Sequence, residues 1–202
     1  MSLLTSSSCT KGQLEGQSSA YAIVDALSAA SGAEPSKFSG ALASDVLTMV
    51  RKTIDGKAVF VPTIFEDPGR VTMHLALKDP GTADKPTSPS STNSITFTRY
   101  HVTYTRADGR NTPGVDVPYG FDGGLTVSLV GGNVSIGQLI LVRGQAKDEA
   151  PLKALIGGGG PITISTIAEV TFYGTDQAGR SVSAIARINV DFADWGDPDS
   201  VG

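Results

Sequence analysis

Residues 181–190 read Ser-Val-Ser-Ala-Ile-Ala-Arg-Ile-Asn-Val, and this stretch decides the fold class. Every second residue from Val182 to Val190 is apolar, and most of the residues between them are polar. Another apolar segment, residues 169–173, precedes it across Asp176-Gln177-Ala178-Gly179, a composition typical of a tight turn. Two such segments on either side of a short turn predict an antiparallel β-hairpin with one buried face.

Further strand patterns lie upstream of this hairpin. Residues 42–53 and 58–64 flank Asp55-Gly56, the strongest short turn signal in the chain, and predict a second hairpin. In residues 95–106 the apolar positions change parity, which predicts a one-residue bulge near Thr98 and Arg99 that keeps both apolar sets on the buried face. The other predicted strands are residues 70–78 and a pair formed by 125–130 and 134–142.

One segment predicts a helix. Within residues 18–31, Ser18 or Ser19 can cap the N-terminus and Gly32 can close the C-terminus. Between them, apolar residues fall at helical spacing: Tyr21, Val24, Leu27 and Ala30. A helix this short is marginal alone, so we expect it to cover the edge or end of a β-structure, or to dock on a partner.

The strand patterns together indicate an all-β fold. Seven to nine short strands with turn signals between them favour an antiparallel β-sandwich carrying one short N-terminal α-helix. The expected division is a flexible tail (1–17), the helix (18–32), the sandwich (33–192) and an acidic C-terminal tail (193–202). Across residues 42–192 the patterning resembles immunoglobulin-like or fibronectin type III domains of bacterial surface proteins and lipoproteins. Paired cysteines and a central tryptophan, which mark antibody domains, are absent from the sequence.

Composition limits the classes of partner. The chain has 16 Lys and Arg against 20 Asp and Glu, a net charge of −4, so it lacks the basic field of a nucleic-acid-binding protein. No apolar run reaches the roughly 18 residues that a transmembrane helix needs. Its single cysteine, Cys9, allows neither an intrachain disulfide nor a four-cysteine zinc site.

Cys9 carries the second resemblance. The preceding residues, Leu3-Leu4-Thr5-Ser6-Ser7-Ser8, resemble the end of a bacterial lipoprotein signal, in which small residues precede a cysteine that becomes lipidated. This resemblance implies a lipid anchor on Cys9, an extracytoplasmic location at the cell surface or in the periplasm, and a hydrophobic leader upstream of Met1. The alternative is a cysteine with no such role in a polar tail.

Catalytic motifs are missing from the sequence, and we expect no enzymatic activity or cofactor. His74 and His101 fall at outward positions of predicted strands. Asp108, Asp116 and Asp122 lie on loops predicted at one end of the fold, where carboxylates can bind calcium. Arginines on the same loops favour a salt-bridged surface instead. A carboxylate-based enzyme built on Asp116 or Asp122 is the least favoured alternative.

Two long loops, 106–124 and 143–161, are the predicted contact surface for a protein or glycan partner. The first offers aromatic, arginine and amide side chains of the kind that interfaces favour: Arg110, Asn111, Tyr119 and Phe121. We therefore expect a non-enzymatic binding or display domain. The alternative is a structural subunit of an assembly such as a phage particle or extracellular filament, with contacts between copies, including a homo-oligomer, through the helix at 18–31.

Overall fold

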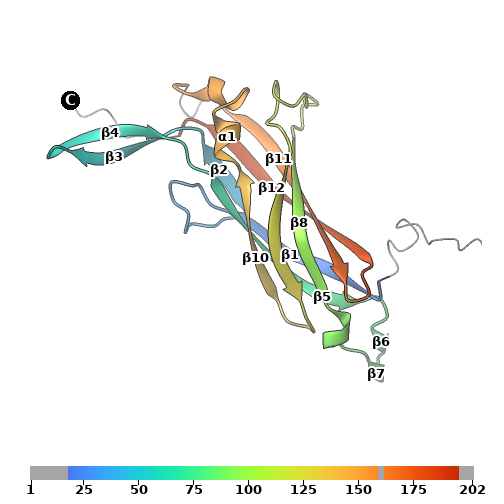
Figure 1. The fold of residues 1–202 in the computed structure, drawn as a ribbon. Coiled ribbons are helices and arrows are strands. Elements are labelled where there is room, and N and C mark those ends of the chain that lie inside the picture. The colour runs from blue at the N-terminus through green and yellow to red at the C-terminus, as the bar shows by residue number, and fades with distance from the viewer. Residues whose placement is uncertain (1–17, 159–161, 196–202) are drawn as a thin grey trace, which may run out of the picture.

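The computed structural model describes residues 18–158 and 162–195, and strands make up more than half of them (Figure 1). This confirms the all-β prediction. The N-terminal tail with Cys9, the end of the glycine run and residues 196–202 lie outside the described residues. No helix among the described residues is long and apolar enough to cross a bilayer.

The larger sheet has five strands in the order β2-β12-β11-β8-β9. Its strands are β2 (Ala41–Asp45), β12 (Ser181–Ala193), β11 (Ile164–Asp176), β8 (Ile95–Thr105) and β9 (Phe121–Leu129). All neighbouring pairs are antiparallel except β2 and β12, which run parallel. The hairpin predicted around Asp176-Gln177-Ala178-Gly179 is β11–β12. Its residues Ala184, Ala186, Ile188 and Val190 are buried. Its predicted antiparallel pairing and buried face are therefore confirmed.

The smaller sheet has three strands in the order β1-β5-β10. They are β1 (Ala20–Ala29), β5 (Asp67–Leu77) and β10 (Ser135–Val142). Two separate ribbons complete the strands, one of β3 (Thr48–Ile54) and β4 (Lys57–Thr63), the other of β6 (Gly81–Thr82) and β7 (Lys85–Pro86). The helical segments are single turns: η2 (Ser91–Asn93), α1 (Gly144–Lys147) and η3 (Leu152–Leu155).

Both sheets contribute to one hydrophobic core. Phe97 and Phe172 meet edge to face in it, with ring centroids 6.3 Å apart. Two tyrosines of β8 connect the five-stranded sheet to β10 in the three-stranded sheet. The Tyr100 hydroxyl donates to the Ile140 carbonyl (3.2 Å) and accepts from its N–H (3.0 Å), and the Tyr104 hydroxyl donates to the Leu141 carbonyl (2.6 Å).

The predicted bulge in β8 is confirmed. The pairing of β8 with both neighbours skips Thr98, between Phe97 and Arg99. The bulge places Ile95 and Phe97 on the same buried side as Tyr100, Val102 and Tyr104.

The predicted helix at 18–31 is wrong, because this segment forms β1 and pairs with β5. The pairing register shifts between Val24 and Ala26. This irregularity turns the two-residue alternation of Ala20 and Val24 into a three-residue step to Leu27, which mimics helical spacing. Sheet pairing and burial then override helix propensity. The segment is therefore part of the β-structure, and a homo-oligomer through a helix at this position has no basis.

Two smaller strand predictions also need correction. Residues 42–53 do not form one strand, since β2 ends at Asp45 and pairs with β12, whereas β3 begins at Thr48 and pairs with β4. The strands β9 and β10 are not a hairpin, because they belong to different sheets. Their apolar residues enter the common core from opposite sides, which the pattern of either strand alone does not reveal.

Candidate functional site

The two ends of the β-structure carry different loops and turns. Ser18 and Ser19 lie beside Asn93 and the β11–β12 turn, where the Asn93 amide contacts the Ser19 hydroxyl (3.5 Å). At the opposite end, here called the distal end, the loop before β9, the segment 143–158, the β3–β4 hairpin and residues 194–195 come together (Figure 1). The two predicted contact loops therefore share the distal end.

A buried ion pair organises the distal end. Lys147 Nζ donates to Asp67 Oδ1 at 2.9 Å, and the two side chains are only 1% and 0% exposed. Asp67 also accepts from the Ser44 hydroxyl (2.6 Å) and the Gly32 N–H (2.8 Å). These donors come from α1, from β2 and from the loop after β1, so a single carboxylate joins three segments to the start of β5. Four polar groups satisfying one another make this burial tolerable.

The electrostatics of Asp67 reflect two opposing effects. Burial raises the pKa of the Asp67 carboxyl above its ordinary value, while Lys147 and the hydrogen bonds from Ser44 and Gly32 lower it. The tyrosines nearby are shifted in the same direction, since burial raises the pKa of Tyr104 and of Tyr100. With every partner of Asp67 inside the protein, this arrangement is suited to holding segments together.

The loop between β8 and β9 is ordered by its own polar side chains. Asp108 accepts hydrogen bonds from Arg106 on both carboxylate oxygens and from Arg110 on Oδ2, with closest contacts of 2.7 and 2.9 Å. These hydrogen bonds hold the pKa of Asp108 well below its ordinary value. Asn111 Oδ1 accepts from the Arg106 N–H at 2.6 Å, and Asp116 Oδ2 accepts from the Thr112 N–H at 3.2 Å.

The three calcium candidates are not brought together. Asp108 is engaged by two arginines, Asp116 by a backbone N–H, and Asp122 by Arg99 (3.4 Å) and His101 (3.2 Å). Within the part of the chain that the structure describes, no group of three or more His, Cys, Asp or Glu side chains is placed to hold a metal ion. The predicted alternative, a salt-bridged surface, describes the geometry of these residues better.

The predicted contact residues divide between surface and core. Tyr119 is 54% exposed, and the Arg110 side chain is 64% exposed even though it contacts Asp108. Phe121 is only 7% exposed, because its ring packs edge to face on Tyr100 and lies under the Arg143 guanidinium at 4.4 Å. Phe121 is thus mainly a core residue. Val115, at 67% exposure on the same loop, was not singled out by the sequence.

The β3–β4 hairpin is a second feature that sequence reasoning did not connect with function. It projects from the β-structure at the left of Figure 1 and pairs with none of the other described strands. Its turn is Asp55-Gly56, with φ angles of 52° and 76°, as the sequence predicts for a two-residue hairpin loop. Ile54 beside the turn is 53% exposed, and apolar residues nearer the base are half-buried. Among the strands that the structure describes, none pairs with either edge of this ribbon.

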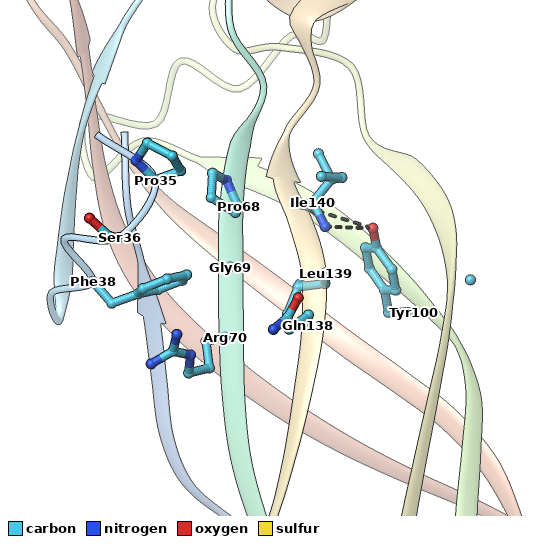
Figure 2. A pocket seen from close by; sticks show the side chains of 11 residues that line it. Pro35, Ser36, Phe38, Pro68, Gly69, Arg70, Tyr100, Gln138, Leu139 and Ile140 are labelled. Atoms are coloured by element: carbon cyan, nitrogen blue, oxygen red, sulfur yellow. Dashed lines mark hydrogen bonds between the residues drawn. The ribbon is translucent and has the colours of Figure 1, made fainter. Parts of the chain in front are cut away.

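A groove with a volume of about 650 Å³ crosses the outer face of the three-stranded sheet. Its floor is formed by outward-facing residues of β5 and β10, where Arg70 lies opposite Gln138 and Pro68 lies opposite Ile140. The loop after β1 forms one wall through Phe38, and Tyr100 lies at the other side (Figure 2). Only register and tertiary contacts assemble this groove, so no local sequence pattern could have indicated it.

Comparison with family models, with curated proteins and with solved structures gave no match. The functional interpretation therefore depends on the sequence and the geometry of this chain alone.

Proposed function

We propose that this chain is a non-enzymatic binding or display domain of a bacterial surface or periplasmic protein, anchored by a lipid on Cys9. One observation carries the proposal. Ser18, the first described residue, lies at one end of the β-structure, while the exposed loops and the projecting hairpin lie at the other. Eight residues separate Cys9 from Ser18, a connection of at most about 30 Å when fully extended. An anchor at Cys9 would present the distal end away from the membrane.

The strand order supports an immunoglobulin-like sandwich as the displayed scaffold. A three-stranded sheet shares its hydrophobic core with a five-stranded one whose edge strand β2 runs parallel to the C-terminal strand β12. Connections pass from one sheet to the other between β5 and β8 and between β9 and β10. Such domains place their variable loops at the two ends of the sandwich, so a contact surface at one end fits the proposal.

Metabolic labelling with alkyne-palmitate tests the anchor. Expressed with a lipoprotein leader upstream, the wild-type chain and the control variant Ser8→Ala should both be labelled and sediment with membranes. Cys9→Ser should be unlabelled and remain in the supernatant. Labelling that persists in Cys9→Ser, or wild-type protein without label, would remove the anchor from the proposal.

Site-specific photo-crosslinking tests the contact surface. A photoreactive amino acid at Tyr119, which is exposed at the distal end, should give adducts with a partner protein in cells. The same amino acid at Ala178, exposed in the turn near Ser18, should not. Adducts from Ala178 alone would place the contact surface at the end near Ser18 and would contradict a contact surface at the distal end.

A structural subunit of a phage particle or filament is the second candidate, and the β3–β4 hairpin favours it. A projecting ribbon that pairs with no other described strand is suited to pairing with a neighbouring subunit. Sedimentation velocity across a concentration series distinguishes the two functions. Oligomers that form with concentration and vanish when residues 49–62 are replaced by a short glycine-serine linker would favour the subunit, and a monomer at all concentrations would exclude self-assembly.

A further inference from the structure

We propose that the groove on the outer face of the β1-β5-β10 sheet binds an extended acidic peptide segment of a partner protein, with the Arg70 guanidinium donating hydrogen bonds to a carboxylate. The inference deepens the proposed binding function by naming a partner class. It concerns a different surface from the distal loops and needs no lipid on Cys9.

Arg70 is held in place without a carboxylate partner. Its guanidinium carbon lies 4.0 Å from the centroid of the Phe38 ring, and among the described residues this ring is its only side-chain partner. Several other arginines are ion-paired: Arg99 with Asp122, Arg106 and Arg110 with Asp108, and Arg187 with Glu169. A guanidinium fixed by stacking keeps its planar set of N–H donors available, and this set matches a carboxylate bidentately.

The surroundings of Arg70 suit an anionic ligand. None of the residues lining the groove is acidic, so nothing in the groove repels a carboxylate. Gln138 faces outward directly opposite Arg70 across the two strands, and its amide can donate to or accept from a peptide group. Pro68 and Ile140 form an adjacent opposite pair and supply apolar contact area. Figure 2 shows these side chains along one side of the sheet.

On the edge of β10 away from β5, the backbone groups of Ile140 are taken by Tyr100, whereas those of Gln138 can bind a peptide main chain. The Ile140 N–H and carbonyl reach the Tyr100 hydroxyl, so these groups point away from β5. Alternate residues of a strand direct their backbone groups to the same edge, and the register is regular from Ser135 to Ile140. The N–H and carbonyl of Gln138 therefore also lie on the edge away from β5. A strand edge beside an arginine is a combination that recognises an extended acidic segment.

An acidic glycan fits this groove less well than a peptide. Sugar rings bind proteins by stacking on free aromatic faces. Arg70 covers one face of Phe38, and the ring of Tyr100 packs over Gly123 and against the edge of Phe121. The groove thus supplies an arginine and backbone groups but little free aromatic surface.

Fluorescence anisotropy with synthetic peptides tests the proposal on the purified chain. The probes are a fluorescein-labelled decapeptide of alternating valine and glutamate and its counterpart with glutamine in place of glutamate. We expect the glutamate peptide to bind at least about ten-fold more tightly, since hydrogen bonds to a charged group contribute enough for such a ratio. Arg70→Gln should abolish this preference. Arg187→Gln, which removes an exposed arginine from the other sheet, should leave it within two-fold.

A steric variant separates loss of the site from loss of folding. A side-chain Cβ at Gly124 would meet no atom within 4 Å, so Gly124→Phe should fold while it narrows the groove and weakens peptide binding. Thermal unfolding of each variant checks the fold, and the shift of the Arg70 Nε–H resonance reports contact directly.

Three results would overturn the proposal: equal affinity for the two peptides, equal losses in Arg70→Gln and Arg187→Gln, or no binding at millimolar peptide. Binding of an oligogalacturonate that depends on Arg70, without peptide binding, would assign the groove to an acidic glycan instead. None of these outcomes bears on palmitate labelling at Cys9, so failure here is distinguishable from failure of the anchored function.

Discussion

The hairpins β11–β12 and β3–β4 differ in what surrounds them. The first lies inside the five-stranded sheet, between β2 and β8, and one of its faces is buried in the core. In the part of the chain that the structure describes, the second pairs with no other strand, and its residues from Arg51 to Ala58 are all exposed. Isolated two-stranded ribbons are marginally stable in water, so β3–β4 depends on contacts at its base and on any partner that covers it. The comparison shows that a hairpin can be kept outside the core, where it remains free to interact.

The base of the β3–β4 hairpin joins it to the packed β-structure. Ser44 precedes the hairpin and Asp67 follows it, and their side chains are hydrogen-bonded at 2.6 Å. Lys147 completes this buried cluster from α1. The ion pair thus fixes the points at which β3–β4 leaves and rejoins the β-structure.

The largest expected effect comes from removing one member of that pair. Lys147→Met leaves the Asp67 carboxyl buried without its cation, and we expect the free energy of unfolding to fall by about 3–5 kcal/mol in urea denaturation. The double variant Asp67→Leu/Lys147→Met should recover only part of this loss, because Ser44 and Gly32 then lose their shared acceptor. Lys153→Met, at an exposed lysine paired with Asp148 at 2.9 Å, is the control and should change stability by less than about 0.5 kcal/mol. A loss below about 1 kcal/mol in Lys147→Met would mean that the pair does not fix the base.

Matched isoleucine truncations compare the two hairpins directly. Ile188 of β12 is 3% exposed and Ile54 of β3 is 53% exposed. Ile188→Ala should lower the free energy of unfolding by about 2–5 kcal/mol, because it opens a cavity in the core. Ile54→Ala should change it by less than about 0.5 kcal/mol. Similar losses from the two variants would place β3–β4 in the same cooperative unit as the core.

The smallest expected effect concerns pH and the exposed loop before β9. Hydrogen bonds from Arg106 and Arg110 lower the pKa of Asp108 from its ordinary 3.8. A lowered pKa in the folded state means that the stabilisation is complete above pH 3.8 and is lost as pH falls through the folded value. An NMR titration of the Asp108 carboxyl carbon should therefore show a midpoint below 3.8, and Arg110→Gln should move it upward. A midpoint at or above 3.8 would contradict the hydrogen bonds from the two arginines.

Local sequence patterns predicted the parts of the fold that local chemistry determines. The alternation of apolar residues predicted the β11–β12 hairpin, and Asp55-Gly56 predicted the β3–β4 turn. The change of parity among the apolar positions of β8 predicted the bulge at Thr98. The same reasoning mistook β1 for a helix, because the register shift after Val24 produces a three-residue step. A bulge and a helical turn have the same signature when only one strand is considered.

The candidate sites depend on contacts between segments far apart in the sequence. Asp67 and Lys147 are 80 residues apart, and neither lies in a motif that marks the other as its partner. The burial of Phe121 follows from Arg143 and Tyr100, which come from other segments. The groove requires the register of β5 against β10 and the placement of Phe38 over Arg70. Tertiary packing decides these features, so the sequence could supply the residue types but not their juxtaposition.

Native-state hydrogen exchange tests most directly whether the chain divides into a packed β-structure and a hairpin that stands outside it. We expect the paired amides of β11 and β12 to exchange only through global unfolding, with protection that follows the stability measured in urea. The amides of β3 and β4 should exchange orders of magnitude faster, through local opening that leaves the core intact. Equal protection in the two hairpins would contradict this division and, with it, the view of β3–β4 as a surface that is free for a partner.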